Sequence, residues 1–143
     1  VDAILARDYP VIQALILLLK DIVKRNHIDP RHIIGHSDIA PARKLDPGPL
    51  FPWKRLAEEG LGVWPDERQV AQQQALLVNA LPDVSWFQQQ LARLGYSTPQ
   101  TGELDVATRG VLAAFQMHYR PARFDGQPDV QSAAILKVLN RQR

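Results

Sequence analysis

The sequence has 143 residues, of which 45% are hydrophobic and 22% charged, with no cysteine and a formal net charge of +2. This composition indicates a folded protein of one medium domain or two small ones. It excludes disulfides, thiolate metal sites and a cysteine nucleophile. The basic residues are spread along the chain, which argues against a nucleic-acid-binding surface. The longest apolar run, residues 14–19, is far too short to span a membrane.

The first predicted element is a helix over residues 10–25. Its apolar residues recur with helical spacing, at Val11, Ile12, Leu15, Leu18, Leu19, Ile22 and Val23. A turn containing Asp29-Pro30 follows, and Ile33 and Ile34 then predict a short strand that delivers His36 at its end. Helix, turn, strand and loop together predict an α/β unit with a site at the end of the strand.

The remaining elements are predicted to be helical. Residues 53–59 form one helical stretch, and residues 66–80 are interpreted as a helical connector capped by Asp66. The last sixty residues then predict three short helices, opened by Ser85, Asp105 and Asp129. The residues expected inside this compact all-α module are Phe87, Leu91, Leu94, Val106, Val111, Leu112, Phe115, Val130, Ile135, Leu136 and Leu139.

Chemistry-bearing residues gather in the loop GHSDIAPARKLDPGP, residues 35–49, whose prolines exclude regular helix and central strand. His36 and Asp46 are candidate zinc ligands, and Lys44 could direct a positive charge at the oxygen of a polarised carbonyl. A catalytic zinc needs three protein ligands, and this loop supplies two. From the residues alone, the favoured interpretation is that His36 is solvent-exposed or caps a turn and that Lys44 and Asp46 form a surface ion pair.

The same loop, followed by FPW at residues 51–53 and by Leu56, resembles the zinc-dependent N-acetylmuramoyl-L-alanine amidases of the type-2 family, which are related to the peptidoglycan recognition proteins. The resemblance implies that residues 1–65 are the C-terminal part of a mixed-sheet amidase domain. It also implies roles for individual residues: His36 and Asp46 as zinc ligands, Lys44 as a catalytic residue, and Arg43 as a partner for substrate carboxylates. The family's third ligand and its catalytic glutamate would then belong to an N-terminal half of the protein that precedes this chain.

Residues 81–143 resemble the three-helix peptidoglycan-binding domain that is often attached to wall hydrolases. The resemblance rests on Leu91, Leu94-Gly95-Tyr96, Gly102, Asp105, Thr108, Leu112, Phe115-Gln116, Asp125-Gly126 and Asp129. The expected architecture is therefore the C-terminal part of a mixed-sheet amidase domain followed by a small all-α peptidoglycan-binding domain.

The resemblance implies zinc-assisted hydrolysis of the amide bond between the lactyl group of N-acetylmuramic acid and L-alanine. The combination with a wall-binding module is most similar to periplasmic lipoprotein amidases of Gram-negative bacteria, so a lipid anchor to the outer membrane is expected outside this chain. Two alternatives stay open. The chain could be a non-catalytic peptidoglycan-recognition protein, or a proteolytic remnant that only binds the wall.

Overall fold

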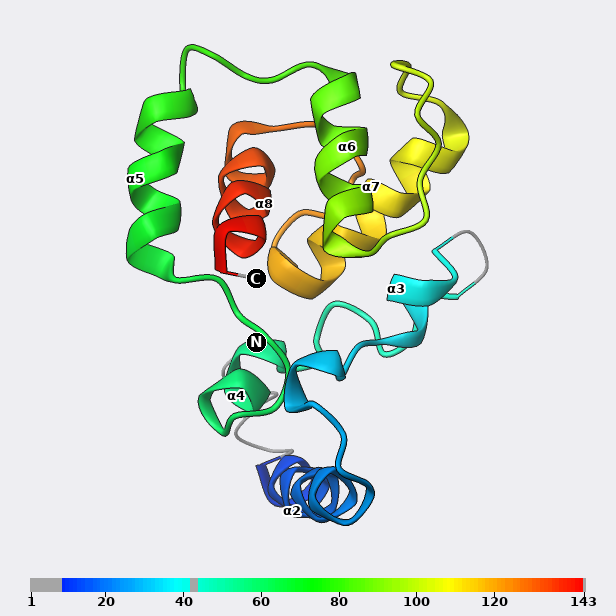
Figure 1. Ribbon diagram of the computed structural model, residues 1–143, viewed down its shortest axis with the longest axis vertical. Coiled ribbons are helices and arrows are strands. Elements are labelled where there is room, and N and C mark those ends of the chain that lie inside the picture. The colour runs from blue at the N-terminus through cyan, green and yellow to red at the C-terminus, as the bar shows by residue number, and fades with distance from the viewer. Residues whose placement is uncertain (1–8, 42–43, 143) are drawn as a thin grey trace. The chain divides into compact units, whose positions relative to one another are not determined.

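The computed structural model describes residues 9–41 and 44–142 (Figure 1). They divide into two compact units. The first comprises the described residues of Val1–Ile34 together with Leu50–Trp64, and the second those of Gly35–Pro49 and Pro65–Arg143. The loop that carries His36 and Asp46 therefore belongs to the same unit as the C-terminal helices.

The first unit contains α2 (Tyr9–Asn26), the 3₁₀ turn η1 (Pro30–His32) and α4 (Trp53–Glu58). The predicted helix over residues 10–25 is confirmed, with Lys24 and Arg25 in the last turn of α2. The core of this unit consists of Ile16, Leu56 and Leu61, against which Ile12, Leu19, Val23, Ile33 and Phe51 pack. Apolar residues of α2 spaced three, four or seven positions apart thus bury one face of the helix.

The predicted α/β fold with a mixed sheet is wrong for this structure, because residues 9–41 and 44–142 contain helices and turns but no strand. The backbone of Ile33 is extended, with φ −82° and ψ 115°, as the apolar pair suggested. A strand also needs a hydrogen-bonded neighbour, and the elements around Ile33 are helical. The short apolar run thus predicted the extended backbone of Ile33 correctly, but a sheet also requires a second extended segment that pairs with the first.

The second unit contains α3 (His36–Ile39), α5 (Glu67–Leu77), α6 (Val84–Leu94), α7 (Val106–Tyr119) and α8 (Val130–Gln142). The prediction that residues 35–49 contain no regular helix is wrong for α3, because its four residues precede the first proline of the segment, Pro41. Helix α8 packs against α5 and α6, and α7 contacts α6 and the short α3 (Figure 1). The largest fully buried apolar residues of the second unit are Phe87, Leu91, Leu112, Phe115, Leu136, Val138 and Leu139. Among the residues described, no helix combines the length and apolarity needed to cross a membrane.

Most of the predicted helix starts in this unit are confirmed. The Asp105 carboxylate accepts a hydrogen bond from the backbone of Thr108 at 2.8 Å, and Asp129 does the same for Ser132 at 2.7 Å. The predicted start at Ser85 is wrong, since Asp83 caps α6. Val106 was expected inside but is 92% exposed, because it is the first residue of α7 and faces away from the core.

Candidate active site

His36 and Asp46 lie next to each other at the surface of the second unit. Nδ1 of His36 is 3.3 Å from Oδ2 of Asp46, and both side chains are about half exposed or more, at 51% and 65%. The backbone of the loop holds them together, because the amide of Ser37 donates a 2.9 Å hydrogen bond to the carbonyl of Asp46. The loop itself thus brings together two residues that are ten positions apart in the sequence.

The spacing of these two atoms fits a shared zinc ion. Zinc bonds of about 2.0–2.1 Å at a tetrahedral angle place two ligand atoms about 3.4 Å apart, close to the 3.3 Å between the imidazole and the carboxylate. No group of three or more His, Cys, Asp or Glu residues that could hold a metal occurs in the part of the chain that the structure describes. The pair therefore fits two of the three protein ligands that a catalytic zinc requires.

Lys44 lies in the same loop, with an exposed side chain. Its amide donates a 2.9 Å hydrogen bond to the carbonyl of Ala40. Asp46 faces His36 rather than forming the surface pair with Lys44 that the residues alone favoured. Arg43, the predicted partner for substrate carboxylates, lies outside the described residues.

A buried carboxylate under the loop was not predicted. Asp38, only 9% exposed, accepts hydrogen bonds from the amide of Gly35 at 2.9 Å, from the hydroxyl of Tyr96 at 2.5 Å and from Nδ1 of His118 at 2.8 Å. His118, in the last turn of α7, is likewise buried, with 4% of its surface exposed. The indication of this cluster in the sequence is that Asp38 lies two residues after the candidate ligand His36.

The electrostatics of this cluster favour an ionised Asp38. Burial alone would raise the pKa of Asp38, but the hydrogen bonds from His118, Tyr96 and Gly35 outweigh it and hold that pKa below its usual value. Burial, together with the neighbouring Asp38 charge, raises the pKa of Tyr96 well above its usual value. The tyrosine therefore stays protonated and donates to the carboxylate.

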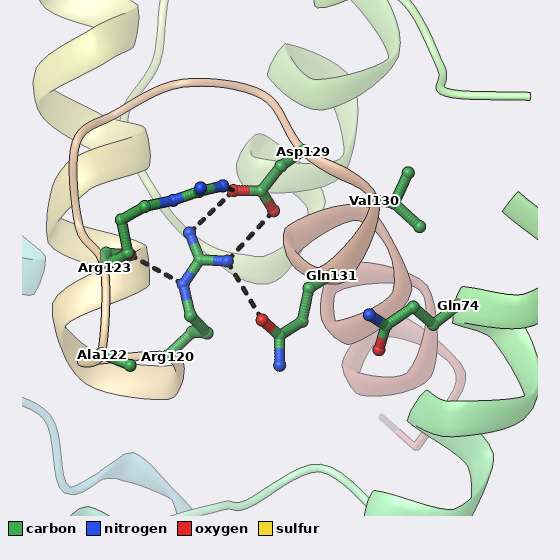
Figure 2. Close-up of a pocket in the computed structure, with 7 residues that line it drawn as sticks. All are labelled: Gln74, Arg120, Ala122, Arg123, Asp129, Val130 and Gln131. Carbon is green, nitrogen blue, oxygen red and sulfur yellow. Dashed lines mark hydrogen bonds and ion pairs between the residues drawn. The ribbon is translucent and has the colours of Figure 1, made fainter. Parts of the chain in front are cut away.

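A second polar cluster lies between α7 and α8, beside an open pocket of about 380 Å³. Figure 2 shows the guanidinium of Arg120 directed at Asp129 and Gln131, with hydrogen bonds of 2.7 Å to Asp129 and 3.2 Å to Gln131. Arg123 donates to the same carboxylate at 3.0 Å. Asp125, whose carboxylate is 3.5 Å from Arg123, supplies a second negative charge. Because the two carboxylates neutralise the two guanidinium groups, the cluster stabilises the connection between the helices and leaves little positive charge for an anionic ligand.

Two families match separate parts of the chain. Residues 7–49 match the N-acetylmuramoyl-L-alanine amidase family, and residues 81–136 match the peptidoglycan binding domain family. This chain is therefore related to the type-2 amidases and carries a peptidoglycan-binding domain. The relationship predicted from the loop at residues 35–49 and from the C-terminal helices is confirmed.

Individual relatives agree with this assignment. The chain is 45% identical over 134 residues to the N-acetylmuramoyl-L-alanine amidase AmiD of Escherichia coli, a match that covers 90% of this chain and 46% of AmiD. Over 44 residues, 31% of this chain and 24% of the relative, it is 44% identical to the 1,6-anhydro-N-acetylmuramyl-L-alanine amidase AmpD of Enterobacter cloacae.

Two solved structures are also similar. The crystal structure of AmpDh3 from Pseudomonas aeruginosa aligns with a TM-score of 0.83 and 41% identity, covering 92% of this chain and 52% of that one. The complex of Escherichia coli AmiD with anhydro-N-acetylmuramic acid-L-Ala-D-γ-Glu-L-Lys aligns with a TM-score of 0.80 and 41% identity, covering 92% and 51%. The chain thus spans about half the length of these relatives.

Proposed function

We propose that this chain is the C-terminal half of a zinc-dependent N-acetylmuramoyl-L-alanine amidase. The reaction is hydrolysis of the amide bond between the lactyl group of N-acetylmuramic acid and the L-alanine of the stem peptide. The observation that carries the proposal is the 3.3 Å approach of His36 to Asp46 inside the segment that matches the amidase family. The complex of AmiD with an anhydromuramyl peptide supports the same substrate class.

In this proposal His36 and Asp46 hold the zinc. When bound, zinc supplies Lewis acidity that polarises the carbonyl of the scissile amide. Lys44, exposed in the same loop, places its ammonium group near the carbonyl oxygen and stabilises the negative charge that develops there during attack. Arg43 pairs with carboxylates of the stem peptide, since a guanidinium can bind a carboxylate through two parallel hydrogen bonds.

The third ligand and the general base are proposed to come from an N-terminal half of the same protein. Two ligands do not fix a tetrahedral site, so the chain by itself should bind zinc weakly. The length of AmiD supports this division, because the match to this chain covers 46% of AmiD. The proposed boundaries are residues 1–65 for the amidase part, 66–80 for the helical connector and 81–143 for the peptidoglycan-binding domain.

The peptidoglycan-binding domain is proposed to hold the enzyme on its polymeric substrate. This arrangement suits a periplasmic enzyme that works on the cell wall, as the match to a wall-binding family supports. Attachment to the outer membrane through a lipid is the finer part of the proposal, and it rests on the similarity to lipoprotein amidases alone.

The proposal is tested by product analysis with the full-length protein and purified sacculi. Mass spectrometry of the soluble fraction should find stem peptides with a free L-alanine amino group, and this release should stop when zinc is removed by a chelator and resume when zinc is restored. Binding to sacculi without any peptide release, at full zinc loading, would instead support a peptidoglycan-recognition protein without turnover.

A further inference from the structure

Asp38 joins the candidate zinc loop to the peptidoglycan-binding domain. It lies two residues after His36 in α3 and accepts hydrogen bonds from Tyr96 and His118, which are 58 and 80 residues further along the chain. Asp38 falls within the residues that match the amidase family, whereas Tyr96 and His118 fall within those that match the peptidoglycan-binding family. All three belong to one compact unit.

The two donors are held firmly in place. Gly95 ends α6 with φ 117°, and the amide of Tyr96 donates a 3.0 Å hydrogen bond to the carbonyl of Leu91, as in a Schellman cap. The ring of Tyr96 packs edge-on against the buried Phe115, with centroids 6.1 Å apart. His118 lies in the last turn of α7 and is 4% exposed. These residues therefore present a rigid platform to α3.

Helix α3 cannot hold its own orientation. It has four residues, and isolated helices shorter than about 12 residues are marginal in water. Its packing partner is α7 (Figure 1), and the buried carboxylate of Asp38 is bonded both to that platform and to the amide of Gly35 at the start of α3. The direction in which α3 presents His36 thus depends on the donors that bind Asp38.

We propose that Tyr96 and His118 are positioning residues for His36, acting through Asp38, so that the peptidoglycan-binding domain completes the support of the zinc site. This inference rests on the proposed zinc amidase function. Loss of the residues that orient a metal ligand typically costs 10–100-fold in metal affinity. The peptidoglycan-binding domain is then needed for hydrolysis of a small soluble muropeptide as well as for binding to the cell wall.

The test uses Tyr96→Phe, which removes only the hydroxyl, together with His118→Leu and His118→Asn. Asparagine can place an amide N–H near the position of Nδ1, so it should restore what leucine removes. Thr108→Val is the matched control, because Thr108 is a fully buried hydroxyl on α7 that binds Gln88 at 2.8 Å and is not bonded to Asp38. Thermal unfolding identifies any variant that does not fold.

Two measurements are made on each variant. Hydrogen exchange of the Ser37 amide, which closes the loop onto Asp46, should be at least about tenfold faster in Tyr96→Phe and His118→Leu than in Thr108→Val, and slow again in His118→Asn. The zinc dissociation constant of the full-length protein should rise about tenfold or more in the same two variants.

The inference is overturned if Ser37 exchanges in Tyr96→Phe and His118→Leu as it does in Thr108→Val, or if asparagine rescues nothing. If His36→Ala in the full-length protein bound zinc as tightly as the wild type does, that result would instead refute the proposed function. The exchange measurement needs no metal, so it decides the positioning role in that case as well.

Discussion

His36 and Asp46 approach to 3.3 Å across a loop whose backbone is closed by the bond from Ser37 to Asp46. The two candidate zinc ligands are therefore brought together within the loop and do not require a sheet to align them. This local construction explains how His36 and Asp46 lie together although the strand expected to deliver His36 is absent from the described residues.

Lys44 is predicted to serve the reaction without holding the metal. In the full-length protein, Lys44→Ala should leave zinc at about one per chain and lower the hydrolysis rate roughly 100-fold, the cost of losing one donor to a developing oxyanion. Lys24→Ala, which removes an exposed lysine of α2, is the control for a general loss of positive charge. Loss of zinc from the Lys44 variant, or an unchanged rate, would contradict the assigned role.

Asp129 is predicted to make the stability of the C-terminal unit sensitive to acid. Burial would raise its pKa, but hydrogen bonds from Arg120, Ser132 and Arg123 hold it at about 2, below the ordinary 3.8. The folded state therefore binds the proton less readily than the unfolded state does. The stabilisation is present above about pH 4 and is lost as the pH falls toward about 2.

The measurement is urea unfolding of this chain at several pH values. Asp129→Asn keeps an oxygen that can cap α8 but loses the charge, so the free energy of unfolding at neutral pH should drop by about 2 kcal/mol. Its dependence on pH between about 4 and 2 should also become flatter than that of the wild type. Asp125→Asn, which removes a more exposed carboxylate 3.5 Å from Arg123, is the control. If the free energy of unfolding depended on pH in Asp129→Asn as it does in the wild type, the Asp129 carboxylate would not be the source of the sensitivity to acid.

Gly126 and Gly110 are predicted to respond in opposite directions to alanine. Gly126 has φ +74°, and an added Cβ would lie 2.5 Å from the backbone oxygen of Arg109, so Gly126→Ala should cost roughly 2 kcal/mol or more. Gly110 lies inside α7, and apart from its chain neighbours and the backbone of its own helix no atom lies within 4 Å of an added Cβ. Gly110→Ala should therefore stabilise by about 0.5–1 kcal/mol. Chemical denaturation followed by circular dichroism compares both with the wild type, and a stable Gly126→Ala would show that this turn can rearrange.

The helices could be predicted because their signals are local. Periodic apolar residues marked α2, and Asp66, Asp105 and Asp129 marked the starts of three later helices. The start of α6 was misplaced because Ser85 and Gln88 resemble a capping box, whereas Gln88 turns inward and donates to Thr108. A sequence pattern cannot distinguish a glutamine that caps its own helix from one that binds a distant threonine.

The site was predictable only in part, for the same reason. The spacing and chemistry of His36, Lys44 and Asp46 are visible within one loop. The contacts of Asp38 with Tyr96 and His118 join residues 58 and 80 positions apart and leave no periodic trace. The two matching families are also separate in sequence, which favours treating them as independent modules. The hydrogen bonds that cross between them become visible only in three dimensions.

The central claim is tested most directly by zinc content and peptide release measured on the same samples of full-length protein. Wild type and His32→Ala, which removes an exposed histidine of η1, should each contain about one zinc per chain and release L-alanine-containing peptide from a muropeptide. His36→Ala should show neither. Zinc at full stoichiometry in His36→Ala, or peptide release that continues without His36, would contradict the account.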